Sequence, residues 1–285
     1  MIPYEQMMAL EPRETVQTYD ACDTILYALG VGAGLRPIHE SLPFVYEEGL
    51  QALPTMAAAL AWPGFWLKEP QYDVDWKRVL HGEHSIEIIE PLPSAGEVVG
   101  RLAIEEVYDK GPGKGALLHS RRDIVDRASG RLLAIERRTS FLRGDGGCGG
   151  SVRKPPSPHL LPEERPCDTS DDMTTAIDQA LIYRLSGDFN PLHADPIVAE
   201  SAGFERPILH GLSTYGAAGL SLLLKLCGGD ASRFKRLDVR FTAPVYPGET
   251  IHTEIWKEGD GKASFRSKAK ERDAVVLNNG YFEYR

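Results

Sequence analysis

The strongest pattern of apolar positions is a helical one in the last third of the chain. Apolar residues recur at roughly helical spacing over residues 212–226, and Gly228-Gly229 follows them as a typical helix end. The pattern predicts the longest buried helix of the chain, with Gly211 at its N-terminus. Backbone N–H groups there lack partners within the helix, and the helix dipole favours negative charge. Gly211 is therefore a candidate oxyanion-binding residue, with simple close packing at a helix start as the alternative.

Beyond this helix the periodicity changes from helical to alternating. Ile251, Thr253 and Ile255 alternate with their neighbours, and Gly259-Asp260-Gly261 predicts a turn. Strand-like stretches cover residues 237–245, 250–257, 263–271 and 274–284. The same order of helix and strands appears earlier, with the strands between residues 85 and 142. The pattern alone predicts an α+β fold built from two similar units.

Short motifs recur in the same order in the two halves. Residues 25–30 resemble residues 181–186, His81-Gly82 resembles His210-Gly211, and residues 90–97 resemble residues 243–249. The order suggests two copies of one fold. Residues 146–166 are rich in glycine, proline and charge and have no periodicity, which is typical of a linker. We therefore predict an N-terminal domain over residues 1–145, a linker over 146–166 and a C-terminal domain over 167–285.

The two copies differ where chemistry is expected. The second has Gly-Asp-Phe-Asn at residues 187–190, whereas the first has Val-Gly-Ala-Gly at residues 31–34. The first copy's counterpart of the long helix, near residues 55–66, is interrupted by Pro63-Gly64. We expect this degenerate helix to leave a volume in the first copy and the chemistry to belong to the second.

The segment Tyr-Arg-Leu-Ser-Gly-Asp-Phe-Asn-Pro-Leu-His at residues 183–193 is the candidate for that chemistry. It separates Asp188 from His193 by Asn190 and Pro191, which favour a turn, so the two side chains can converge. A carboxylate beside an imidazole is a general acid/base pair. Asp195-Pro196 then predicts a helix start, which would hold the loop between ordered elements. The alternative is an ordinary surface loop.

Ser-Gly-Asp-Phe-Asn-Pro-Leu-His, followed by Ala-Gly-Phe-Glu-Arg-Pro-Ile-Leu-His-Gly at residues 202–211, resembles the signature of the MaoC-like, R-specific enoyl-CoA hydratases (type 2 hydratases). Residues 27–33, 81–83, 109–115 and 144–150 resemble the N-terminal domain of the two-domain form, found in peroxisomal multifunctional beta-oxidation enzymes. Cys148 departs from that pattern, where an aromatic residue is expected.

The resemblance implies a double hotdog fold whose first copy accommodates the distal acyl chain. It implies that Asp188 and His193 form the catalytic pair, Asn190 orients the site and the Gly211 amide binds the thioester oxygen. The implied reaction is the reversible hydration of trans-2-enoyl-CoA to (3R)-3-hydroxyacyl-CoA. No cofactor is required, because coenzyme A is part of the substrate, and we expect no metal.

Composition and charge are those of a globular enzyme rather than a nucleic-acid-binding protein. The 285 residues carry a formal net charge of −9, which argues against a nucleic-acid surface. No apolar stretch approaches a membrane span. We see neither a secretion signal at the N-terminus nor a peroxisomal signal in the final residues, and four scattered cysteines fit a reducing compartment. A cytoplasmic location is expected, and a homodimer remains open.

An acidic protein needs a local patch of positive charge to bind coenzyme A, which is polyanionic. Four basic residues closely follow the long helix and are our candidates: Arg233, Lys235, Arg236 and Arg240. An ordinary solvated basic turn is an equally good interpretation of them.

Two rival functions need to be separated from hydration. His193 and Asp195, with His210 or His252, have the ligand types of a two-His-one-carboxylate metal site, but that interpretation leaves Asp188 and Gly211 without roles. Hotdog proteins also include acyl-CoA thioesterases and non-catalytic acyl-CoA binders, and a binder has no need of an acid/base pair.

Overall fold

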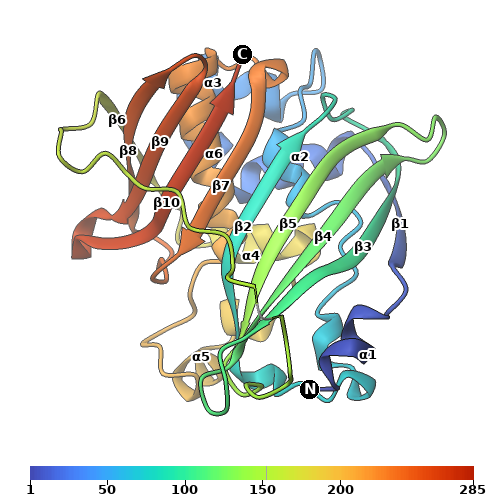
Figure 1. Ribbon diagram of the computed structural model, residues 1–285. Helices are drawn as coiled ribbons and strands as arrows, with labels where there is room; N and C mark the ends of the chain where they lie inside the picture. The colour runs from blue at the N-terminus through green and yellow to red at the C-terminus, as the bar shows by residue number, and fades with distance from the viewer. Residues whose placement is uncertain (152) are drawn as a thin grey trace.

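The computed structural model describes residues 1–151 and 153–285. In these residues ten strands form one antiparallel sheet in the order β1-β3-β4-β5-β2-β7-β10-β9-β8-β6 (Figure 1). The strands are β1 (Arg13–Tyr19), β2 (Val79–Ile88), β3 (Gly96–Asp109), β4 (Ala116–Asp126), β5 (Leu132–Leu142), β6 (Thr169–Thr174), β7 (Phe234–Phe241), β8 (Thr250–Gly259), β9 (Lys262–Ala269) and β10 (Ala274–Tyr284).

The strand order repeats between the two halves of the sheet. The first half runs β1-β3-β4-β5-β2 and the second runs β6-β8-β9-β10-β7, which is the same order with every number raised by five. β2 and β7 pair with each other, from Glu83 opposite Arg240 to Glu87 opposite Arg236, and join the halves into one sheet. The predicted α+β fold of two similar units is confirmed.

The helices are α1 (Tyr4–Met8), α2 (Ala21–Gly30), α3 (Ile38–Val45), α4 (Gln179–Tyr183), α5 (Pro196–Ser201) and α6 (Gly211–Cys227). Helices α2, α3, α4 and α6 lie on the same side of the sheet (Figure 1). Among the described helices, none is long and apolar enough to cross a membrane.

Helix α6 is the long buried helix that the apolar pattern predicts. It packs against β6, β7, β8 and β10, and it ends where Gly228 adopts a left-handed conformation with φ 65°. Two of its glycines allow close neighbours, because a Cβ at Gly216 would collide with Val31 and one at Gly219 would collide with Thr55. Helix α6 therefore lies between the sheet and the segments of the first half that contain Val31 and Thr55.

The first half lacks an equivalent of α6, as expected. The helical conformation already ends before Pro63-Gly64. Only a short 3-10 helix forms, from Pro54 to Ala58. The Arg122 guanidinium donates to the carbonyls of Ala57 (3.1 Å) and Ala58 (2.8 Å), which are the acceptors that a continuing helix would need. Ala61 then adopts a left-handed conformation, with φ 50°. At the interruption, the carbonyls that a helix would use therefore accept from a residue of the sheet instead.

The predicted linker crosses from one half to the other without forming a helix or strand in its described residues. One of its residues, His159, accepts a hydrogen bond from Asn279 on β10 through its carbonyl oxygen. Because the two halves share one sheet, the boundaries 1–145, 146–166 and 167–285 are proposed as units of the repeat rather than as independent bodies.

Candidate active site

The loop that carries Asp188 is held at both ends by short ordered elements. After α4, Gly187 adopts a left-handed φ of 113° and turns the chain into the loop. The Asn190 side chain accepts from the Leu192 amide (3.1 Å) and so begins a 3-10 turn that ends at His193. Asp195 then caps α5 by accepting from the Ile197 amide (2.9 Å), as the sequence predicts. The Asn190 contact thus fixes the path between carboxylate and imidazole, and the Asp195 contact fixes the chain that follows them.

Asp188 and His193 converge, and His210 joins them. One carboxylate or ring-nitrogen atom from each of the three residues lies within 4.8 Å of the others. The rings of His193 and His210 stack with centroids 3.7 Å apart and an angle of 28°. The sequence predicted that Asp188 and His193 form a pair, but it placed His210 near them only in the rival metal-site interpretation.

Each imidazole uses one nitrogen to fix its orientation. Nδ1 of His193 lies 2.8 Å from the carbonyl oxygen of Ile208, and Nε2 of His210 lies 3.0 Å from that of Asp188. A carbonyl oxygen can only accept, so both nitrogens carry hydrogen and donate. The second nitrogens, Nε2 of His193 and Nδ1 of His210, are therefore left as proton acceptors when the rings are neutral.

Burial keeps both rings neutral near pH 7. It is the main cause that lowers the pKa of His193 below its usual 6.5. Burial and the neighbouring His193 lower the pKa of His210 to about 4. A neutral imidazole beside the Asp188 carboxylate can take a proton from water and return it.

Gly211 is exposed at the first position of α6. Its amide donates to no backbone carbonyl among the described residues, whereas the amides of Ser213 and Thr214 both reach the carbonyl of His210. A Cβ at Gly211 would lie 3.3 Å from the ring of Phe241, so glycine also lets β7 approach closely. Both interpretations of Gly211, a free N–H at a helix N-terminus and close packing, are compatible with this geometry.

The four basic residues suggested for coenzyme A do not form a cluster. Arg233 lies beyond the C-terminus of α6 and donates to the carbonyl of Cys227 (3.0 Å), at the opposite end of a 17-residue helix from Gly211. Arg236 is paired with Asp238, and Arg240 with Glu83. Of the four, Arg240 lies next to Phe241 and so nearest the candidate site. Arg233 precedes β7 and the other three residues lie at different points along it, so a group that is compact in the sequence is extended in the structure.

The metal-ligand set expected as a rival does not assemble. The Asp195 carboxylate caps α5, and His252 pairs with Asp172 at 2.5 Å. Among the described residues, those that could hold a metal are instead Asp188, His193 and His210. The same three groups suit acid/base chemistry, so their geometry is compatible with both a metal site and an acid/base site.

A cavity of about 120 Å³ adjoins the loop that carries Asp188. Its walls include Leu185 to Gly187 from the loop, Tyr27 from α2, and Met56, Ala59 and Leu60 from the segment that replaces a helix in the first half. The space next to the loop is therefore bordered by the degenerate segment, as the sequence pattern predicts.

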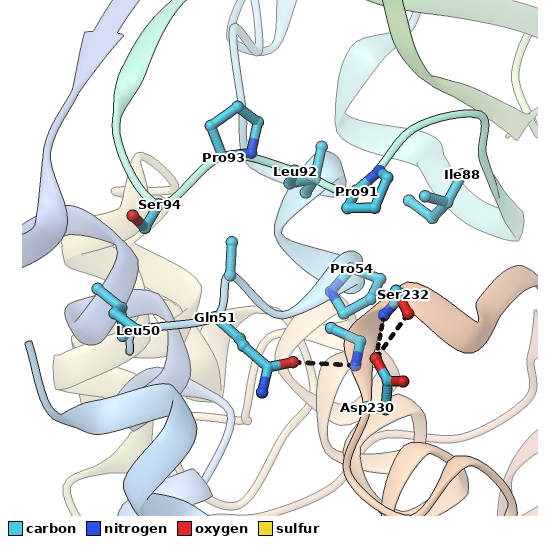
Figure 2. Close-up of a pocket in the computed structure, with 12 residues that line it drawn as sticks. Leu50, Gln51, Pro54, Ile88, Pro91, Leu92, Pro93, Ser94, Asp230 and Ser232 are labelled. Atoms are coloured by element: carbon cyan, nitrogen blue, oxygen red, sulfur yellow. Dashed lines mark hydrogen bonds between the residues drawn. The ribbon is translucent and has the colours of Figure 1, made fainter. Parts of the chain in front are cut away.

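A second cavity, of about 280 Å³, lies at the other end of α6 (Figure 2). Its lining combines residues of both halves, and its main polar groups are already partnered. The Gln51 side chain accepts from the Ala231 amide (3.1 Å), and Asp230 accepts from the amide and hydroxyl of Ser232. This cavity is lined by no residue of the loop that carries Asp188, whereas the first cavity is bordered by Gly187, which directly precedes Asp188.

Comparison with known proteins gives matches over nearly the whole chain. Residues 17–144 match the MFE-2 hydratase 2 N-terminal domain, and residues 160–279 match the MaoC like domain. The chain is 42% identical to 3-hydroxyacyl-thioester dehydratase Y of Mycobacterium tuberculosis, over 92% of this chain and 91% of the relative. It is 38% identical to the peroxisomal enoyl-CoA hydratase 2 of Arabidopsis thaliana, over 98% and 94% of the two chains.

The solved structures agree with the sequence comparison. A MaoC-like dehydratase from Phytophthora capsici superposes with a TM-score of 0.88 at 37% identity, covering 99% of this chain and 98% of the other. A Mycobacterium tuberculosis protein described as having a double hotdog fold superposes with a TM-score of 0.59 at 18% identity, covering 99% and 98%, which supports the fold alone. The chain therefore belongs to the MaoC-like dehydratase family, in the double-hotdog form in which an MFE-2 hydratase 2 N-terminal domain precedes the MaoC like domain.

Proposed function

We propose that the protein catalyses the reversible hydration of trans-2-enoyl-CoA to (3R)-3-hydroxyacyl-CoA. The observation that carries the proposal is the convergence of Asp188 and His193 beside the exposed N-terminus of α6. The names of the relatives, an enoyl-CoA hydratase 2 and a 3-hydroxyacyl-thioester dehydratase, describe the two directions of such a reaction.

The carbonyl oxygen of the thioester must be stabilised first. Water is a poor nucleophile, and the double bond is reactive only because it is conjugated with that carbonyl. As the oxygen of water bonds to the β carbon, the electrons of the double bond move towards the carbonyl oxygen and form an enolate-like state. The Gly211 amide and the N-terminal end of the α6 dipole are suited to bind that negative charge.

Two protons must then move, one away from water and one to the α carbon. Asp188 and His193 lie close enough to hold one water molecule between them. One of the two takes the proton of water, and the pair returns a proton to the α carbon, so no proton is gained or lost overall. The Asn190 side chain fixes the turn between them by accepting from the Leu192 amide. The backbone N–H of Asn190 donates to the Asp188 carboxylate (3.2 Å).

The fall of kcat/KM at low pH should follow the protonation of the neutral imidazole. Because burial lowers the pKa of His193 below 6.5, we expect kcat/KM to be flat near pH 7 and to fall only below pH 6.5, as protonation removes the base. His193 and His210 are in contact, so this fall describes the group rather than one ring. The measurement is kcat/KM for a short enoyl-CoA across pH, and a loss already centred above pH 6.5 would contradict a buried base.

The cavity next to the loop supports a place for the acyl chain in the first half. If the chain enters it, Ala59→Trp should lower kcat/KM for long enoyl-CoAs about tenfold or more relative to crotonyl-CoA, because each displaced methylene contributes about 0.8 kcal/mol. The matched control is Ala128→Trp, at an exposed turn between β4 and β5. A chain-length ratio that stays flat in folded Ala59→Trp would exclude this path.

Thioester hydrolysis, simple acyl-CoA binding and metal chemistry are separated by one assay. Incubated with a trans-2-enoyl-CoA, a hydratase consumes the double bond and keeps the thioester, a thioesterase releases free thiol, and a binder does neither. We expect loss of the double bond alone, at the same rate with and without EDTA. Release of thiol, or a loss of activity that zinc or iron restores, would favour a rival.

Three further properties stay predictions. Coenzyme A contacts are proposed at Arg240 rather than at Arg233, Lys235 or Arg236, because Arg240 alone of the four lies next to Phe241 and the start of α6. A cytoplasmic location is an expectation from the sequence, which leaves the choice between monomer and homodimer open.

A further inference from the structure

The first half of the sheet carries charged residues on the side that packs towards α6. Arg122 on β4 and Glu136 on β5 are 0% and 1% exposed. Arg138 follows Glu136 on the same side of β5 and lies opposite His84 of β2. The His84 ring packs against Tyr215 of α6, with centroids 4.8 Å apart. Burial of charged groups is costly unless opposite charges compensate them.

Glu136 alone does not balance the two arginines. Its carboxylate lies 3.1 Å from Nε of Arg122 and 3.7 Å from Nη2 of Arg138, so two guanidinium groups share one negative charge. Burial lowers the pKa of His84 well below 6.5, so this ring adds no charge. Arg138 stacks on Trp62, with the guanidinium carbon 4.0 Å from the ring centre. A second carboxylate is needed to balance the charges.

The loop of the second half brings Asp188 towards Arg138. The cavity beside that loop has both Gly187 and Leu60 among its lining residues. Asp188 directly follows Gly187 in the chain, and Trp62, which stacks on Arg138, is two residues beyond Leu60. The loop that carries Asp188 and the segment that covers Arg138 therefore meet at one cavity.

The start of α6 gives a second connection between Asp188 and Arg138. His210, directly before the helix, donates to the carbonyl of Asp188 (3.0 Å). Tyr215, about one turn into the helix, contacts the histidine opposite Arg138. Electrostatics agree with this proximity. Burial lowers the pKa of Arg138 overall, whereas the carboxylates of Glu136 and Asp188 raise it, so Asp188 is the second acid that acts on this guanidinium.

We propose that Arg138 is a positioning residue for the hydration: its charge, held against Trp62, compensates the Asp188 carboxylate and keeps it in place. With Asp188 counted, two arginines face two carboxylates and the charges balance. The first half, which has no acid/base pair of its own, thus supplies a charge that the chemistry of the second half uses. This inference rests on the proposed hydration.

The first test separates positioning from substrate binding. Arg138→Met should lower kcat for a short enoyl-CoA about tenfold or more with little change in KM, because Arg138 acts on Asp188 and not on the substrate. Arg138→Lys keeps the charge and should recover part of the lost kcat. Arg137→Met is the matched control, because Arg137 is the neighbouring residue on β5, is 36% exposed and lies beside acidic residues on the surface. It should keep the kcat of the parent.

The second test measures the charge pairing without any substrate. Arg138→Met leaves two buried carboxylates facing one arginine and should lower Tm by roughly 5 °C or more. In an Asp188→Asn background the same substitution leaves one charge of each sign, so the loss of Tm should shrink to about half or less. Arg137→Met should change Tm equally in the two backgrounds.

Each outcome decides for or against the pairing. Equal Tm losses from Arg138→Met in the two backgrounds would overturn the inference, because Glu136 alone would then compensate Arg138. An unchanged kcat in folded Arg138→Met would overturn it as well. If Arg138→Met folds only together with Asp188→Asn, the pairing is supported, and failure to fold in both backgrounds counts against it. If no enoyl-CoA is hydrated at all, it is the proposed function that fails, and the Tm comparison still tests the pairing.

Discussion

Asp188→Ala and His193→Ala should each lower kcat for enoyl-CoA hydration by about 10² to 10⁴, with a modest effect on KM. Each substitution removes proton transfer in the transition state rather than uniform binding of the substrate. Because the two side chains converge within 4.8 Å and can share one water molecule, their effects should not multiply. The double variant should be little slower than the slower single variant.

The controls for these variants come from strand β4. Asp123 is paired with Arg121 on the surface, and His119 lies beside Tyr108, away from the loop. Asp123→Ala and His119→Ala should keep nearly full activity. Near-full activity of either Asp188→Ala or His193→Ala would refute the assignment, and penalties that multiply in the double variant would argue against a shared water molecule.

His210→Ala should be the next most damaging substitution, with a loss of about 10 to 10² in kcat. His210 donates to the carbonyl of Asp188, stacks on His193 and precedes Gly211, so it joins the three parts of the site. We class it as a positioning residue. Its loss should also expose His193 and move the acidic limb of the pH profile towards pH 6.5, because burial is the main cause of the lowered pKa.

A conservative variant separates positioning from simple packing. His210→Asn keeps a side-chain N–H and should recover part of the lost kcat, whereas His119→Ala again serves as the control. An unchanged pH profile in an otherwise impaired His210→Ala would indicate a loss of packing only. Near-full activity of His210→Ala would remove the residue from the account.

The regular elements could be predicted from the sequence because their signals are local. Apolar spacing and Gly228-Gly229 predict α6 almost to its ends, and alternation predicts β8, β9 and β10 within a few residues. The repeated motifs predict the repeated strand order. The missing helix of the first half was predicted, but the hydrogen bonds from Arg122 to Ala57 and Ala58 that accompany it could not be, because they join segments far apart in the sequence.

In the candidate site, too, local contacts could be predicted from the sequence and long-range contacts could not. The Asn190 and Asp195 contacts act over two residues, so the turn that brings Asp188 towards His193 could be predicted. The contact of His210 with the Asp188 carbonyl spans 22 residues and depends on the fold. The basic residues from Arg233 to Arg240 look like a patch in the sequence, but strand geometry separates them and acidic neighbours on the sheet pair with two of them.

The central claim is that Asp188, His193 and the start of α6 together add water to a thioester-conjugated double bond. The most direct test is to incubate the purified protein with trans-2-enoyl-CoA and to determine the configuration of the product by chiral analysis. The account predicts (3R)-3-hydroxyacyl-CoA with the thioester intact, formed by Asp188→Ala at least about 10²-fold more slowly than by the parent. A (3S) product, free thiol without hydration, or equal turnover by Asp188→Ala would contradict it.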